Sequence, residues 1–307
     1  MFELFKKRDL ASFITDTISF FKLEGKTFFK NYFIINGPLL AVLVICMYLL
    51  GGSLFTDVFQ NNTNLETLLG EDVAYSALRL ILLIITSIIF SIIAYTFPIL
   101  YLQNMANGIE HTSNTYLKQL KSVSGRAIVF ALGSFFLIIP LLLICLFISV
   151  LLSFILIGIP LFIILSAFSI SWTCIAYYEY TSNGTSFFNA YGKAFDTIKS
   201  SFWPIIGNTL IVYFIIQIIT SIVSFLPQSY YYFKLFTSLN EGTSIESELS
   251  PLFITVMGIS MIVSVLISFV STNFLLVNQG LIYYSGKEKE KSFNAFNSIE
   301  EIGSNEE

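Results

Sequence analysis

Charged residues are scarce in this chain and unevenly spread along it. Asp, Glu, Lys and Arg together make up 12% of the 307 residues, about half of the roughly 25% that is usual in soluble domains. A helix needs about 20 apolar residues to cross the hydrocarbon core of a bilayer. Five intervals that contain none of the four charged residue types are long enough for six such helices, because the third holds two: 31–56, 80–109, 127–178, 200–233 and 249–286.

A soluble helical core is excluded by the pattern within these intervals. A core helix of a soluble protein is apolar along one stripe, whereas these segments are apolar around the whole helix. The first apolar run begins near Phe33 and lacks the short hydrophobic region and the small-residue cleavage site of a signal peptide, so we expect an uncleaved anchor. The sequence therefore predicts an all-α polytopic membrane protein with six transmembrane helices.

Cysteine and histidine are also nearly absent, which limits metal and nucleophile chemistry. The three cysteines, Cys46, Cys145 and Cys174, all fall within predicted spans, which argues against a disulfide framework or a thiolate metal site. The one histidine, His111, stands in a predicted loop with no second ligand at metal-binding spacing. No nucleotide-binding, serine-hydrolase or zinc-protease motif occurs. We expect no enzyme activity, cofactor or metal, and the net charge of −4 predicts no nucleic-acid partner.

The cations that are present indicate the orientation. Of the 16 Lys and Arg, 14 fall on one side of the predicted spans. They are Lys6, Lys7, Arg8, Lys22, Lys26 and Lys30 before span one, Lys118, Lys121 and Arg126 between spans two and three, Lys193 and Lys199 between spans four and five, and Lys287, Lys289 and Lys291 after span six. The opposite loops are acidic. The positive-inside rule then predicts that both termini lie in the cytoplasm.

A threefold repeat is visible along the chain. Each unit consists of an amphipathic helix lying in the membrane interface, followed by a hairpin of two spans. The units cover 9–107, 110–184 and 185–286 and form one transmembrane domain, and the tail 287–307 is charged and expected to be disordered. Alternatively, the interfaces of any six-span protein would show similar features, because Tyr and Trp favour them.

A basic residue and a glycine mark the start of each repeated hairpin at nearly constant spacing. The pairs are Lys30 with Gly37, Arg126 with Gly133 and Lys199 with Gly207. We interpret the cations, together with Trp203, as interfacial anchors, and Gly207 as a position where a neighbouring helix approaches closely.

Polar side chains inside the spans admit two interpretations. The deepest are Gln217 in span five and Asn273, Asn278 and Gln279 in span six, which would either line a polar cavity or form hydrogen bonds between helices, and we favour the second. Arg79 and Glu179 stand at the ends of spans, where we expect them to extend to the headgroups. No Asp, Glu, Lys, Arg or His falls inside a predicted span, so the markers of an ion path are missing.

Small hydroxyl residues form a stripe along span six. Ser260, Ser264, Ser268 and Thr272 recur every four residues and so share one helix face. Because helices in a bilayer associate through small residues, this stripe predicts a packing face inside the protein, or alternatively a subunit interface.

The segment AYGKAFDTIKSSFWPIIGNTL (190–210) combines an amphipathic helix, a basic residue, aromatics and glycine. In this feature, and in its six spans and predicted cytoplasmic termini, the chain resembles a family of bacterial integral membrane proteins that includes the membrane domain attached to some glycerophosphodiester phosphodiesterases. The resemblance covers nearly the whole chain and implies a bacterial inner-membrane location. It implies no enzyme activity, because the catalytic barrel of the phosphodiesterases is absent.

Three functions fit the sequence. The leading hypothesis is a non-catalytic scaffold or accessory subunit of a membrane protein complex, because the spans lack charge while three cationic helices lie at the interface. The alternatives are a transporter that handles a lipid or small solute between the hairpins, and a protein that shapes the membrane through its amphipathic helices.

Overall fold

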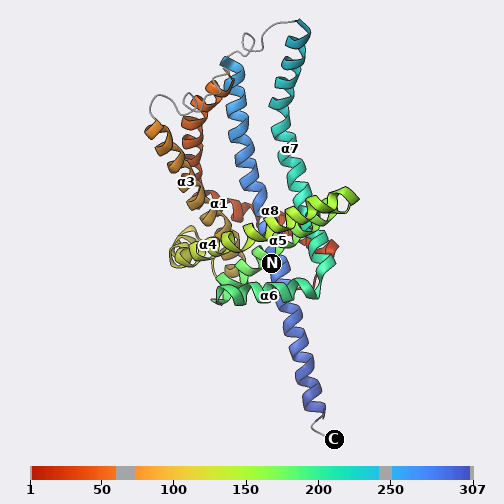
Figure 1. Ribbon diagram of the computed structural model, residues 1–307. Helices are drawn as coiled ribbons and strands as arrows, with labels where there is room; N and C mark the ends of the chain where they lie inside the picture. The colour runs from red at the N-terminus through yellow and green to blue at the C-terminus, as the bar shows by residue number, and fades with distance from the viewer. Residues whose placement is uncertain (1, 60–72, 242–250, 305–307) are drawn as a thin grey trace. The chain divides into compact units, whose positions relative to one another are not determined.

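The computed structural model describes residues 2–59, 73–241 and 251–304, and none of these residues lies in a β-strand. The helices are α1 (Leu10–Phe59), α3 (Val73–Ala106), α4 (Ser113–Leu152), a short 3₁₀ helix (Ser153–Ile155), α5 (Gly158–Asn183), α6 (Phe187–Ser200), α7 (Phe202–Glu241) and α8 (Pro251–Ser304) (Figure 1). Six of them are long and apolar enough to cross a bilayer. The chain is therefore an all-α multi-pass membrane protein, as predicted.

The segments that we predicted as interfacial helices differ in how they join the spans. In α1 and α4 the segment and the span form one continuous helix, whereas α6 is separated from α7 by Ser201. Pro204 follows this break, and it has no N–H to donate to the carbonyl of residue 200. Proline alone does not end a helix here, since Pro38 and Pro140 lie inside α1 and α4. Ser201 has φ −153° and ψ 50°, outside the helical region. No proline stands at the corresponding place in α1 or α4.

The described part of the tail 287–307 is helical, while the disorder expected for it stays a prediction. Helix α8 continues without interruption from its span through Lys287 to Ser304, and only 305–307 lie outside the described residues. The tail begins with alternating Lys and Glu, which favour helix and pair along it. The Lys287 ammonium lies 3.8 Å from the Glu290 carboxylate in the next turn.

The chain forms two compact units. Unit 1 contains Met1–Phe33, Tyr95–Phe214 and Asn273–Glu307, and unit 2 contains Ile34–Ala94 and Ile215–Thr272. Unit 2 includes Arg79 and Lys234, so the 14 remaining Lys and Arg, the same ones that the sequence analysis assigned to one side of the membrane, all belong to unit 1. The side chain of Arg79 itself lies outside the described part.

The core of unit 1 is rich in aromatic rings from α1, α3 and α4. Phe28 of α1 packs edge-on against Phe97 and Tyr101 of α3, with ring centroids 5.2 and 4.9 Å apart. Tyr116 of α4 stacks parallel to Tyr101. All four rings are fully buried, and such pairs each contribute about 0.5–1.5 kcal/mol beyond their buried area.

Candidate functional site

Glu179 is a buried carboxylate of unit 1 with several polar partners. It lies in the last turns of α5 and is 1% exposed. Lys193 of α6 places its ammonium 2.7 Å from Oε1, and Lys287 of α8 places its ammonium 3.0 Å from Oε2. Asn183 and Tyr283 each donate a hydrogen bond to Oε2, at 2.6 and 3.0 Å. One carboxylate therefore joins three helices, and these partners offset the cost of removing its charge from water.

This arrangement corrects the sequence interpretation of Glu179, which we expected to extend to the headgroups. The local part of the cluster follows from helical spacing, since Asn183 follows Glu179 by one helical turn and Lys287 follows Tyr283 in the same way, which puts each pair on one helix face. From this spacing alone, the sequence could have indicated that the two members of each pair lie side by side. The contact between the two pairs joins α5 to α8, which are far apart in the sequence, and depends on the fold.

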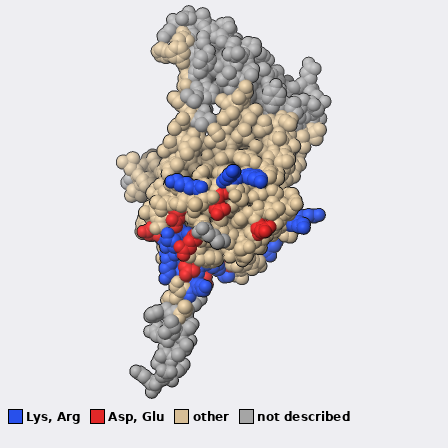
Figure 2. All heavy atoms as spheres, turned by 180° about the vertical axis from the view of Figure 1, so that it is seen from behind, with Lys and Arg blue, Asp and Glu red and all other residues tan. Residues whose placement is uncertain are grey.

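A groove opens beside this cluster. It has a volume of about 360 Å³ and runs between α6 and α8, with Glu179 and Ile175 of α5 among its lining residues. Lys289 also lines it and donates a hydrogen bond to the Ser201 hydroxyl at 2.7 Å. Figure 2 shows acidic and basic side chains gathered close together on the face that it draws. The groove is the candidate binding site of unit 1.

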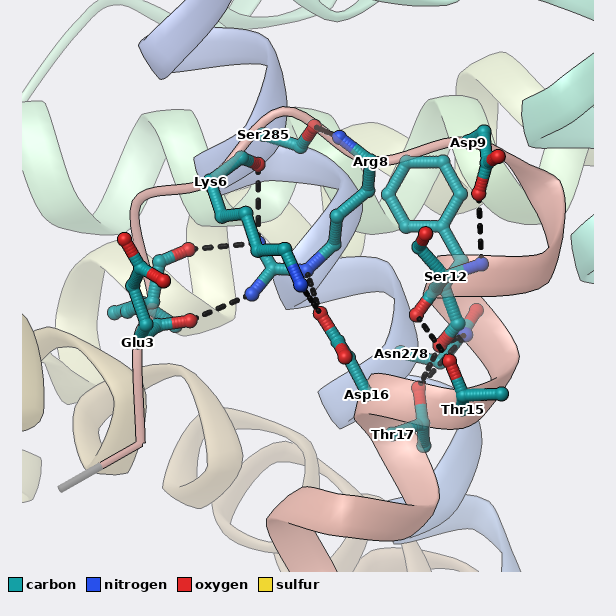
Figure 3. A network of polar contacts seen from close by, with 12 residues as sticks. Glu3, Lys6, Arg8, Asp9, Ser12, Thr15, Asp16, Thr17, Asn278 and Ser285 are labelled. Carbon is teal, nitrogen blue, oxygen red and sulfur yellow. Dashed lines mark hydrogen bonds and ion pairs between the residues drawn. The ribbon is translucent and has the colours of Figure 1, made fainter.

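The segment before α1 is held by a buried cation, Arg8 (Figure 3). Its guanidinium is fully buried and its Nε lies 2.9 Å from the Asp16 carboxylate. The Nη atoms donate to the carbonyl oxygens of Glu3, Leu4 and Lys6, at 2.6, 2.8 and 3.3 Å. The Arg8 guanidinium thus links its own segment, residues 2–9, to Asp16 of α1.

The same segment also contacts α8. The backbone N–H of Arg8 donates to the Ser285 hydroxyl at 3.0 Å, and the rings of Phe5 and Tyr284 meet edge to face with centroids 5.1 Å apart. The Asp9 carboxylate then accepts the N–H of Ser12 at 2.8 Å. This contact caps α1, and hydrogen bonding to Ser12 lowers the pKa of Asp9. The N-terminal segment is therefore a packed part of unit 1.

We expect Arg8→Met to loosen this segment, because the side chain binds Asp16 of α1 and three carbonyls of the segment itself. The variant loses a buried ion pair and three hydrogen bonds, and a loss of about 2 kcal/mol would speed cleavage through local opening about 30-fold. Proteinase K digestion in detergent, read by mass spectrometry of the fragments from 2–9, measures the rate. Lys7→Met removes a neighbouring exposed cation and should leave the rate unchanged, and equal rates in the two variants would contradict the proposed role of Arg8.

A buried polar network links α1, α7 and α8 in unit 1. The amides of Asn278 and Asn208 bind one another reciprocally at 2.8 and 3.2 Å, and Asn278 also donates to the Thr17 hydroxyl at 3.0 Å. Gln279 donates to the Thr209 hydroxyl at 2.8 Å. These five residues are at most 4% exposed. In this network the deep amides hydrogen-bond between helices, which is the second of the two interpretations given for them above.

The other candidate residues of spans five and six are not brought together. Asn273 is buried in unit 1 at 1% exposure, whereas Gln217 is exposed in unit 2 and accepts a hydrogen bond from Thr220. Within the stripe, Ser264 and Thr272 donate to the carbonyls one turn earlier in α8 itself. Ser260, Ser264 and Thr272 are half-exposed and Ser268 is exposed. The packing role of the stripe stays a prediction.

The three basic residues at the starts of the hairpins have different surroundings. Lys30 and Lys199 are exposed, as is Trp203 at 68%. Arg126 instead donates to the carbonyl oxygens of Tyr180 and Thr185 at 2.7 and 3.1 Å, with its guanidinium 4.3 Å from the centre of the Tyr180 ring. A cation at the C-terminal end of α5 also complements the helix dipole. The sequence did not predict this capping role.

The three glycines of these repeats differ as well. A Cβ at Gly133 would lie 2.8 Å from the Phe187 ring at the start of α6, and one at Gly207 would lie 3.0 Å from Leu10 at the start of α1. A Cβ at Gly37 would meet open space. Close approach therefore accounts for the glycine at two of the three positions.

His111 has a structural environment. Its ring stacks on Tyr101 with centroids 4.2 Å apart, its Nδ1 binds the Tyr116 hydroxyl, and its carbonyl accepts a hydrogen bond from Asn31 at 3.2 Å. Burial lowers the pKa of His111, which favours the neutral ring. Over the described residues, no group of three or more His, Cys, Asp or Glu could hold a metal ion, and the three cysteines are free thiols.

Comparison of the chain with models of known protein families, with curated proteins and with solved structures gave no match. Function is therefore inferred from the geometry of the chain itself.

Proposed function

We propose that this integral membrane protein is a non-catalytic scaffold or accessory subunit of a membrane protein complex. The observation that carries the proposal is the exposure of α4. In its most apolar stretch only 6% of the residues are buried within the protein, against 28% in α5, the other span of the same hairpin. Since helices in a bilayer associate by packing against one another, a span with so few internal neighbours suits a helix of another protein.

The residues on α4 and at the turn that follows it support this use. Phe136 and Phe147 are 73% and 66% exposed, and Phe154 in the 3₁₀ helix is 90% exposed. Large aromatic side chains of this kind are the usual anchors of protein interfaces. The base of the hairpin is fixed, because Arg126 binds the end of α5 and Tyr191 of α6 donates to Ser134 of α4 at 2.9 Å.

We further propose a bacterial inner-membrane location with both termini in the cytoplasm. The grouping of 14 Lys and Arg in unit 1 supports this orientation, because the positive-inside rule places such clusters on the cytoplasmic side. The bilayer and other membrane proteins are then the partners.

Site-specific photocrosslinking in native membranes tests the proposal. A photoreactive phenylalanine analogue at Phe136 or Phe147 should give one crosslinked product that contains a second, identifiable membrane protein. The same protein should co-purify in fixed stoichiometry in mild detergent. Phe214 of α7, which is 50% exposed, is the matched control and should give only lipid adducts.

Two results would contradict the accessory role. Lipid adducts alone at all three positions would mean that lipid covers α4. A product that contains only this chain would show a homo-oligomer instead.

A further inference from the structure

We propose that the groove between α6 and α8 binds a phosphate group at the membrane surface, through Lys193, Lys287 and Lys289. The groove lies wholly in unit 1. Its volume of about 360 Å³ is within the roughly 300–1,000 Å³ of small-molecule sites. This site is separate from the exposed face of α4 and does not depend on the accessory role.

The charge balance at the inner end of the groove favours an anion. Glu179 supplies one negative charge to two ammonium groups, those of Lys193 and Lys287. The Lys289 ammonium instead donates to the neutral hydroxyl of Ser201. The Lys193 side chain is 53% exposed, so water screens its charge. Among the less exposed groups, Lys287 and Lys289 carry two positive charges against the one negative charge of Glu179, an excess of one.

The two other carboxylates that line the groove, Asp196 and Glu290, contribute less to its electrostatic potential. Asp196 is exposed, and the side chain of Glu290 is 65% exposed with its carboxylate 3.8 Å from the Lys287 ammonium. Charges in contact with bulk water contribute little to binding, because water and salt screen them. The field that a ligand meets at the inner end is accordingly positive.

The donors of the groove remain accessible. An ammonium group has three N–H donors, and the Lys193 ammonium makes one recorded contact while its side chain is 53% exposed. The hydroxyls of Thr197 and Ser200 also line the groove, but each donates its one hydrogen within α6, to the carbonyls of Lys193 and Thr197 at 2.9 and 2.8 Å. The ammonium groups of three lysines in one groove offer several donors to an anion with several acceptor oxygens, such as a phosphate.

The depth of the groove points to the headgroup region. The apolar run of α8 ends at Gly286, directly before Lys287, and α5 reaches its first charged residue at Glu179. Tyr283 and Tyr284 precede the lysines, and tyrosine is enriched at the membrane–water interface. Phosphate groups of lipids lie at this level, so a lipid headgroup and a soluble phosphate ester both have access to the site.

The experiment compares two variants of equal charge in the purified full-length protein. Lys289→Met removes a groove lysine that makes no recorded contact with Glu179, so the buried cluster stays intact. Lys291→Met removes an exposed lysine of the same helix outside the lining. The probes are inorganic phosphate and dioctanoyl-phosphatidylglycerol, with dioctanoylglycerol as the phosphate-free control. Binding is measured by thermal shift and by native mass spectrometry.

The proposal would be supported if either phosphate probe binds the wild type, with an affinity that is about tenfold weaker in Lys289→Met and unchanged in Lys291→Met. Binding of the phospholipid alone would identify a headgroup as the ligand, and binding of inorganic phosphate as well would identify a soluble phosphate. Equal effects of the two variants, equal binding of dioctanoylglycerol, or no binding to the wild type would overturn the proposal.

Discussion

Replacing Glu179 with alanine should lower the free energy of unfolding of unit 1 by about 3–5 kcal/mol, the range measured when one member of a buried ion pair is removed. The variant would leave the Lys193 and Lys287 ammonium groups facing each other without the carboxylate that separates them. It would also remove the acceptor of Asn183 and Tyr283. Thermal unfolding in detergent, followed by far-ultraviolet circular dichroism, measures the loss.

Two further variants separate the buried charge from a general charge effect. Glu290→Gln removes a carboxylate from the same groove at a position where the side chain is 65% exposed. Its melting temperature should stay close to that of the wild type, because exposed ion pairs contribute little to stability. Adding Lys287→Met to Glu179→Ala should recover part of the loss, because it removes one of the two unpaired cations. If Glu179→Ala melts like Glu290→Gln, the carboxylate does not hold the three helices together.

The six spans could be predicted from the sequence because their signal is local. A charge-free interval such as 80–109 or 200–233 must be buried in lipid or in protein wherever the rest of the chain lies. Pro204 is a local signal at the break before α7, because it has no N–H to donate to the carbonyl of residue 200, although Pro38 and Pro140 lie inside continuous helices. The continuity of α1 carried no comparable signal, because residues 10–30 and the apolar residues after them are both helical by composition.

The groove could not be predicted because its parts come together only in three dimensions. Glu179 directly follows the apolar interval 127–178. A carboxylate that faces the lipid headgroups would be found at the same position, so the sequence does not distinguish the two environments. Its cationic partners belong to two other helices, α6 and α8, and nothing in their spacing along the chain identifies them. For the same reason the sequence suggested one role for the three repeated cations, whereas Arg126 alone binds the end of a neighbouring helix.

The glycines show how a regular pattern can conceal different causes. The spacing between basic residue and glycine is nearly constant in the three repeats, yet only Gly133 and Gly207 stand where another side chain approaches. At Gly280 of α8, side chains of α3 and α5 both approach within 2.5 Å of where a Cβ would lie, yet Gly280 belongs to no repeated pattern. Packing depends on which residue faces the position, and the sequence of one helix does not contain that information.

Gly280→Ala should therefore destabilise unit 1 although it adds a single methyl group. The new Cβ would lie 2.3 Å from Leu102 of α3 and 2.5 Å from the Tyr178 hydroxyl of α5. Both side chains are fully buried, so the methyl group fits only if they shift within the packed core. Displacing Tyr178 would also break its hydrogen bond to the Leu276 carbonyl, now 2.9 Å long. We expect a loss of about 3 kcal/mol or more, the upper range for overpacked cores.

Gly192→Ala is the matched control, because it makes the same substitution in a helix interior where a Cβ would meet open space. There the methyl group should stabilise helix α6 by about 0.5–1 kcal/mol, the difference in helix propensity between alanine and glycine. The two variants should thus shift the melting temperature in detergent in opposite directions. Shifts of the same sign would mean that backbone propensity, and not the contact of Gly280 with Leu102 and Tyr178, decides the effect, and α3, α5 and α8 would then not meet as closely as described.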